Sequence, residues 1–226
     1  MNKYDSDNPK YPTSNRMDSV VVFEIVTTSW LNDGMPTQDE QARMTMAQLR
    51  RCFKMNQPDE IVGIATATLT LRDEPVIGEP SVIFVKPKLS EVSDITLDQL
   101  GVSRTYFNEN SVPLAEALWR MRTLTADTGS LPCWASWGDY PARKIKRDCE
   151  RVKARHPFSS RMINTKAITP FLLRTRVDLS MSQVVELVDI EQYGISSDLV
   201  DDFADNRRTI VGNVLVSAAI TAWSLS

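Results

Sequence analysis

The stretch Val20-Val21-Val22-Phe23-Glu24-Ile25-Val26-Thr27-Thr28-Ser29-Trp30 decides the fold. It begins with β-branched and aromatic residues, which is the composition of a buried strand, and it ends in hydroxyl-bearing residues. α/β proteins place their chemistry outside the carboxyl ends of such central strands. Glu24 is the only charged residue between Asp18 and Asp33. Its carboxylate is either a ligand or general base, or it sits at a strand end and reaches water, and the second is the commoner arrangement.

Length and composition describe an ordinary globular protein. The 226 residues suffice for one sizeable core or two small ones, and 42% hydrophobic with 24% charged residues is typical of soluble domains. Residues 1–16 contain no apolar signal segment, and we expect residues 1–18 to form a disordered tail. Cys52, Cys133 and Cys149 lack metal-ligand spacing, which favours free thiols in a cytoplasmic location. One histidine, His156, leaves little for a zinc site or a Ser-His-Asp triad.

The net charge of −3 hides a strong asymmetry along the chain. Residues 142–176 carry eleven Lys or Arg and two acids, whereas residues 177–205 carry eight acids and no base. The basic segment is suited to phosphates, and the acidic one to cations or to docking on the basic one. The alternative is two solvated faces that bind no ligand.

Apolar periodicity predicts a mixed α/β sheet with helices on both faces. Further strands are predicted at residues 61–71, 81–85 and 131–137. Helices are predicted at residues 38–55, 113–124, 139–155, 168–175, 181–190 and 206–223, with a helical turn at 97–100. Residues 209–226 are uncharged but marginally long for a bilayer, and we expect this helix to pack on the sheet rather than to enter a membrane.

The predicted helix 38–55 belongs to an insertion at about residues 37–57. Thr37 followed by Glu40 is a capping-box pattern. An apolar stripe lies along one face and arginines along the other. The helix either packs locally or meets a protein partner.

Several segments resemble, in consistent order, the DEDDh-type 3′-to-5′ exonuclease family. Residues 23–30 resemble its first motif, Asp-x-Glu followed by Ala/Thr-Thr-Cys-Trp, in the variant of the histone-mRNA hairpin exonucleases and the bacterial KapD-like proteins. Ala135-Ser136-Trp137-Gly138-Asp139-Tyr140 resembles the family's Ser-Trp-Gly-Asp-Tyr-Asp. Further likenesses lie at residues 60–65, 84–90, 97–102, 147–149, 157–158, 163–166 and 205–211. The resemblance implies an RNase H-like fold over residues 19–226, with a five-stranded mixed sheet flanked by helices.

The family's catalytic residues are not kept. In the family, four carboxylates hold two divalent metals and a histidine acts as general base. These five positions fall on Glu24, Val26, Pro141, Asp201 and Asn206. None has the family's residue type, and magnesium requires near-ideal octahedral oxygens. We therefore expect no catalytic residue and no cofactor, with Glu24 as the weak remaining metal candidate.

Two alternatives stay open beside this pseudoenzyme. The first is a diverged, active exonuclease that uses magnesium or manganese at a relocated site with Asp139, Asp202 or Asp205. A one-residue step on a helix turns a side chain by about 100°, so Asp205 would point away from the old site. The second alternative is a structural subunit that binds another protein through helix 38–55.

A basic helix supplies the predicted nucleic-acid surface. The candidate phosphate ligands are Arg143, Lys144, Lys146, Arg147 and Arg151. Trp30, Trp134, Trp137 and Tyr140 are candidates for base stacking, although such residues are more often core. The predicted function is a catalytically inactive exonuclease-like module that binds single-stranded RNA or DNA, or a protein.

Overall fold

The computed structural model describes residues 18–28, 59–71, 73–123, 133–158, 161–204 and 208–225. The predicted tail apart from Asp18, the insertion at 37–57 with helix 38–55, Trp30, Asp205 and Asn206 lie outside these ranges. Statements about them remain predictions.

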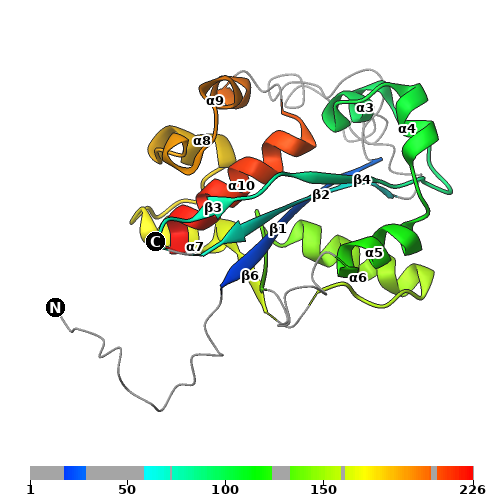
Figure 1. Cartoon of the computed structure of the whole chain (residues 1–226), viewed down its shortest axis with the longest axis horizontal. Coiled ribbons are helices and arrows are strands. Elements are labelled where there is room, and N and C mark those ends of the chain that lie inside the picture. Colours follow the sequence, from blue (N-terminus) through cyan, green and yellow to red (C-terminus); the bar gives the residue numbers. More distant parts are fainter. Residues whose placement is uncertain are drawn as a thin grey trace, which may run out of the picture.

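A mixed sheet forms the centre of the molecule (Figure 1). Its strands are β1 (Ser19–Thr27), β2 (Ile61–Thr70), β3 (Val76–Ile77), β4 (Ser81–Phe84), β5 (Cys133–Ser136) and β6 (Met162–Asn164). The order is β3-β2-β1-β5-β6, and β4 also pairs with β2. β3 and β4 pair with β2 at different residues, so the sheet is five strands wide, as predicted. β2 is antiparallel to β1, β3 and β4, whereas β5 is parallel to β1 and β6.

β1 lies in the middle of the sheet, and its side chains are therefore buried on both faces. Val20, Val22 and Val26 belong to one apolar cluster, and Val21 and Phe23 belong to another. Successive strand residues point to opposite faces, so a strand covered on both sides is a continuous apolar run. The uninterrupted Val-Val-Val-Phe sequence is therefore the signature of this position.

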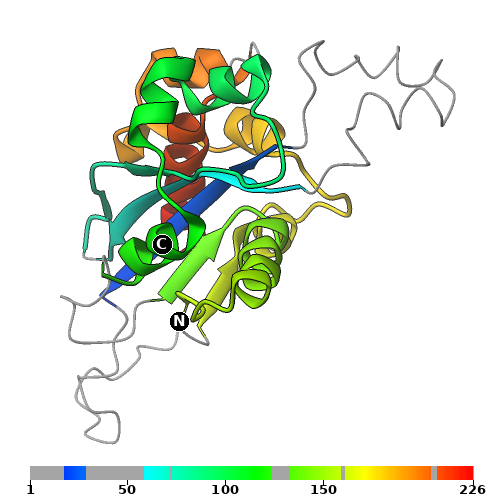
Figure 2. The same cartoon turned by 90° about the vertical axis from the view of Figure 1, so that its right-hand side faces the viewer.

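Helices cover both faces of the sheet (Figure 2). The described helices are α3 (Asp94–Leu100), α4 (Arg104–Asn110), α5 (Leu114–Thr123), α6 (Tyr140–Val152), α7 (Thr165–Leu172), α8 (Met181–Leu187), the 3-10 helix η3 (Glu191–Tyr193), α9 (Ser197–Ala204) and α10 (Ile210–Leu225). α5 and α6 pack on the Phe23 face, and α10 crosses the other face against β1 and β2. The predicted helices that fall within the described ranges thus appear, while α4, η3, α9, β3 and β6 were not predicted.

α10 is a helix of the protein interior, as predicted. None of the described helices is long and apolar enough to cross a membrane. Ser217 and Thr221, from its polar seam, are fully buried. The Thr221 hydroxyl donates to the carbonyl of Ser217 and lies 3.1 Å from the Thr165 hydroxyl of α7. The seam therefore satisfies its own polar groups where α10 meets the rest of the fold.

Gly63 lies where the sheet and the helices that cover it approach each other closely. A Cβ atom at this position would lie 2.3 Å from Cδ2 of Leu100 and 3.2 Å from Cδ1 of Ile210. Leu100 is 3% exposed, so it has little room to move away.

We expect Gly63→Ala to lower the free energy of unfolding by about 1–3 kcal/mol, because overpacking forces the Leu100 side chain to shift. Urea unfolding measures the loss. In a Leu100→Ala background the same substitution should cost less, since the clashing methyl group is gone. Equal losses in both backgrounds would contradict the close approach.

Candidate functional site

A cleft of about 580 Å³ opens at the carboxyl end of β1. Its walls come from the end of β1, the turn after β5, and the first residues of α7, α8 and α10. The lining side chains that bear on function are Glu24, Val26, Trp137, Tyr140, Lys166, Arg208 and Asn213. Strand ends of α/β sheets are a common place for ligands, and the opening stretch of the sequence predicted chemistry here.

Glu24 joins three parts of the fold. One oxygen, Oε1, accepts hydrogen bonds from the backbone N–H of Trp137 at 3.0 Å and from the Ser217 hydroxyl at 2.8 Å. Burial raises the pKa of the Glu24 carboxyl from 4.5 to about 7, although both hydrogen bonds act to lower it. Glu24 is 9% exposed, so its role is internal hydrogen bonding rather than the water-facing strand end that the sequence favoured.

The other family positions offer few oxygens to the cleft. Val26 lines the cleft with an apolar, 7% exposed side chain. Pro141 is buried in the first turn of α6. Asp201 is exposed on α9 and is not among the lining residues. Asn206 lies outside the described residues, so the structure brings only Glu24 and Val26 together at the cleft.

The relocated-site residues are not gathered at the cleft either. Asp139 is the N-cap residue of α6 but makes no side-chain capping bond. Its carboxylate instead accepts from the Asn164 side-chain amide. Neither Asp139 nor Asp202 lines the cleft, and Asp205 is outside the described ranges. In the part of the chain that the structure describes, no three His, Cys, Asp or Glu residues are grouped to hold a metal ion.

Two cationic side chains line the cleft, and sequence reasoning missed both. Lys166, in the first turn of α7, is half-buried and lies 3.9 Å from where a Cβ of Gly138 would be. Arg208 donates to the Ser182 hydroxyl, and burial lowers the pKa of its guanidinium. With Glu24 close to half-protonated at neutral pH, the described lining carries net positive charge. No spacing pattern relates residues 166 and 208 to each other, since only the fold makes them neighbours.

Helix α6 presents a smaller basic surface than predicted. Lys144 is 2% exposed, and its ammonium donates to Oδ2 of Asp148 at 2.7 Å and to the Asp59 carbonyl at 2.5 Å. The prediction that Lys144 contacts phosphate is corrected, because this cation is neutralised inside the protein. Arg151 lies 3.4 Å from Oε1 of Glu60. The exposed cations Arg143, Lys146 and Arg147 remain, and we call these three the α6 basic face.

The candidate stacking residues divide into core and cleft. Trp134 is fully buried and meets Phe23 and Phe158 edge-on, so it belongs to the core and is not available for stacking. Trp137 and Tyr140 line the cleft. The Tyr140 hydroxyl donates to Oδ2 of Asp59 at 2.8 Å, which holds its ring at the rim.

We expect Lys144→Met to lower the free energy of unfolding by about 3–5 kcal/mol, because Asp148 would keep a buried charge without its main partner. The double variant Lys144→Met/Asp148→Leu should recover most of this loss. Lys146→Met, exposed on the same helix, is the matched control and should stay within about 0.5 kcal/mol. Chemical denaturation of the wild type and the three variants measures these free energies of unfolding. A Lys144→Met protein as stable as the wild type would contradict the buried ion pair.

The raised pKa of Glu24 predicts that the free energy of unfolding depends on pH and falls as this carboxyl ionises. Its folded-state pKa of about 7 exceeds the unfolded value of 4.5, so the folded state holds a proton that the unfolded chain has released. The stabilising contribution is complete below the unfolded pKa and is lost as pH rises through about 7.

In Glu24→Gln we expect this pH dependence to disappear, because glutamine keeps the acceptor oxygen and cannot ionise. The difference in unfolding free energy between the two proteins should change by about 3 kcal/mol from pH 4 to pH 8. Denaturant titrations at several pH values measure it, and subtraction cancels the titration of other groups such as His156. Parallel curves would mean that Glu24 ionises normally.

Comparisons with known proteins identify the fold. No family model matches the chain, and no curated protein matches its sequence. A solved 3′-exonuclease that recognises the histone mRNA stem-loop aligns with a TM-score of 0.63 and 13% identity, covering 92% of this chain and 82% of that one. The nuclease domain of 3′hExo, a DEDDh family member bound to rAMP, aligns with a TM-score of 0.60 and 13% identity over 93% of each chain.

Cell-death related nuclease 4 gives a TM-score of 0.58 at 14% identity, with 92% of this chain and 64% of that chain covered. Identities this low establish architecture and not chemistry. They confirm the resemblance drawn from the sequence motifs at the level of fold. The chain therefore has the RNase H-like fold of the DEDDh 3′-exonucleases.

Proposed function

We propose that this chain is a catalytically inactive exonuclease-like protein that binds single-stranded nucleic acid without a metal ion. The observation that carries the proposal is the state of Glu24, the residue at the family's first carboxylate position. Its Oε1 atom already accepts two internal hydrogen bonds, and its pKa is about 7. At neutral pH this group supplies less than one negative charge to the cleft.

Loss of the neighbouring ligands supports the same conclusion. Val26 and Pro141 carry no side-chain oxygen. Two-metal catalysis needs several ionised oxygens that bridge both ions, and magnesium gives up its water only to a near-ideal octahedral set. One partly protonated carboxyl, with the apolar Val26 as its neighbour in the cleft, is a poor substitute for that set.

Lys166 and Arg208 make the cleft suitable for phosphate itself. In a metal-dependent nuclease the ions neutralise the phosphate that the carboxylates would repel. Here the lining cations can do so directly, since a guanidinium matches phosphate geometry and an ammonium acts as a point charge. The protein would thus hold a nucleotide where its relatives in fold cut one.

The α6 basic face extends this surface. α6 begins at Tyr140, which lines the cleft, and Arg143 and Lys146 follow within its first two turns. A strand that stacks a base on Tyr140 or Trp137 could continue along these cations. Structural neighbours include an exonuclease seen with an mRNA stem-loop and one from E. coli complexed with single-stranded DNA. Their ligands support nucleic acid as the class proposed here.

Fluorescence anisotropy with labelled oligo(U) and oligo(dT), in buffer containing a chelator, tests the proposal. We expect binding without metal, with affinity that falls steeply as salt rises. Arg143→Ala/Lys146→Ala should lower the slope of log affinity against log salt by about 1.4, because each lost phosphate contact removes about 0.7 for a single strand. Lys86→Ala/Arg176→Ala removes two exposed cations outside the cleft and α6, and should leave the slope unchanged.

A nuclease assay tests the opposite possibility, that the protein is an active enzyme. Shortening of the same oligonucleotides from the 3′ end with manganese, abolished by Glu24→Gln, would show an active enzyme and overturn the proposal. Absence of any salt-dependent binding would instead leave the fold without a nucleic-acid role.

A further inference from the structure

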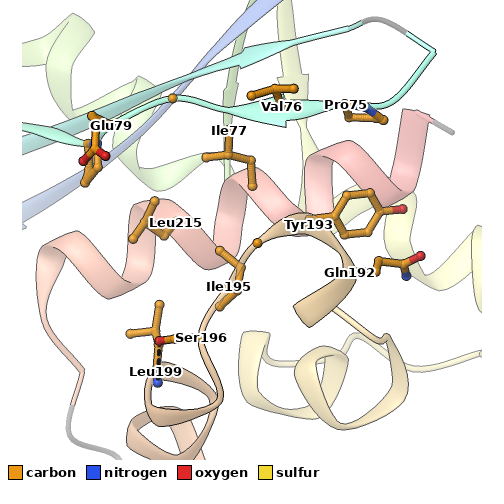
Figure 3. A pocket seen from close by; sticks show the side chains of 13 residues that line it. Pro75, Val76, Ile77, Glu79, Gln192, Tyr193, Ile195, Ser196, Leu199 and Leu215 are labelled. Carbon is orange, nitrogen blue, oxygen red and sulfur yellow. Dashed lines mark hydrogen bonds between the residues drawn. The ribbon is translucent and has the colours of Figure 1, made fainter.

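A second hollow, of about 500 Å³, lies at the opposite edge of the sheet from β6 (Figure 3). One wall is the segment around β3, at residues 75–80. The other is the connection from η3 to α9, at residues 192–199. We call this hollow the β3 groove. Its described lining shares no residue with the Glu24 cleft.

The floor of the β3 groove is apolar. Ile77 from β3, Ile195 from the η3–α9 connection and Leu215 from α10 point towards one another (Figure 3). Leu199 adds a further apolar side chain, and Val76 on the strand is 56% exposed. An apolar channel beside a strand can take up alternate side chains of an added extended segment.

β3 also offers unpaired backbone groups. It ends the sheet and pairs only with β2 among the described strands. The Gly78 N–H donates to the Thr68 carbonyl at 2.8 Å, and Ile77 lies opposite Leu69. Antiparallel ladders alternate hydrogen-bonded and non-hydrogen-bonded pairs, so the N–H and C=O of Ile77 face away from β2. An edge of this kind is a template for another strand.

The surroundings of the β3 groove are acidic. Residues 73–85 contain three acids and no base, and residues 177–204 contain seven acids and no base. Glu79 lines the groove, and Glu191 and Asp198 directly precede lining residues. These three side chains are exposed, and within the described ranges none forms an ion pair. Among the residues that the structure describes, the groove therefore lacks its own countercharge, and this negative charge disfavours nucleic acid as its ligand.

We propose that the β3 groove docks an extended, lysine- or arginine-rich segment of a partner protein by strand addition to β3. The backbone of the segment pairs with Ile77, and alternate apolar side chains enter the channel over Ile195 and Leu215. Its cations face Glu79 and Asp198. Charge complementarity selects this occupant, because an acidic or nucleic-acid ligand would meet uncompensated negative charge. The proposal does not depend on what the Glu24 cleft binds.

A labelled peptide of alternating lysine and valine, added to the full chain at low salt, tests the proposal by fluorescence anisotropy. We expect binding, and no binding of a glutamate–valine peptide. Glu79→Gln/Asp198→Asn should weaken binding about fivefold, as exposed charge pairs are individually weak. Asp98→Asn/Glu109→Gln removes two exposed acids of α3 and α4 and should leave affinity within about twofold, because distant charges are screened.

Hydrogen exchange distinguishes strand addition from charge attraction alone. The bound peptide should slow exchange of the Ile77 amide, which attraction to acidic side chains would leave untouched. Four results would overturn the proposal: no binding of the lysine–valine peptide, equal weakening by both double variants, an unprotected Ile77 amide, or a dimer that Glu79→Gln/Asp198→Asn dissociates. Peptide binding that appears only after deletion of residues 1–17 would also overturn it, since the occupant would then be the chain's own segment.

Discussion

The hydrogen-bonded carboxyl of Glu24 is the constraint on which the cleft depends. It joins β1 to the turn after β5 through the Trp137 N–H, and to α10 through the Ser217 hydroxyl. A buried acceptor left unpaired costs far more than a single hydrogen bond contributes. The position of α10 over the sheet and the position of the Trp137 turn are therefore coupled through one side chain. This coupling occupies Oε1, one of the two oxygens with which the Glu24 carboxylate could ligate a metal ion.

The same desolvation that raises the pKa of Glu24 also sets the electrostatics of the cleft. A carboxyl with a pKa of about 7 supplies less than one full negative charge at neutral pH to the cleft that Lys166 and Arg208 also line. Charges act over longer range in low-dielectric surroundings than at a wet surface. Positive potential at the cleft and negative potential around the β3 groove thus occupy different parts of one domain. α10 takes part in both sites, because its Asn213 lines the Glu24 cleft and its Leu215 lines the β3 groove.

Sequence patterns predicted those parts of the fold that burial alone determines. The run around Phe23, covered on both faces, and the amphipathic helices could be read directly from the order of apolar residues. β6 was missed because a three-residue strand is too short for periodicity, and α4 was missed because it buries only Phe107 and so carries no apolar stripe. Lys144 was misassigned because the i,i+4 spacing to Asp148 is equally compatible with an exposed helix face, and the Asp59 carbonyl that its buried ammonium also contacts lies 85 residues away in the chain. Lys166 joins Arg208 in the cleft only through tertiary structure, which no local pattern encodes.

Replacing a carboxylate cluster changes stability as well as chemistry. Ionised oxygens held close together repel one another, so an active two-metal centre carries a cost that the bound ions offset. Val26, 7% exposed, and the buried Pro141 contribute apolar contact at positions where the resemblance to the DEDDh exonucleases would place such charge. A domain without such a cluster could keep a hydrogen-bonded, partly protonated carboxyl at Glu24 and hold its fold without ions. On the proposed function the stability–activity trade-off does not oppose this arrangement, because binding alone does not require the carboxylate cluster.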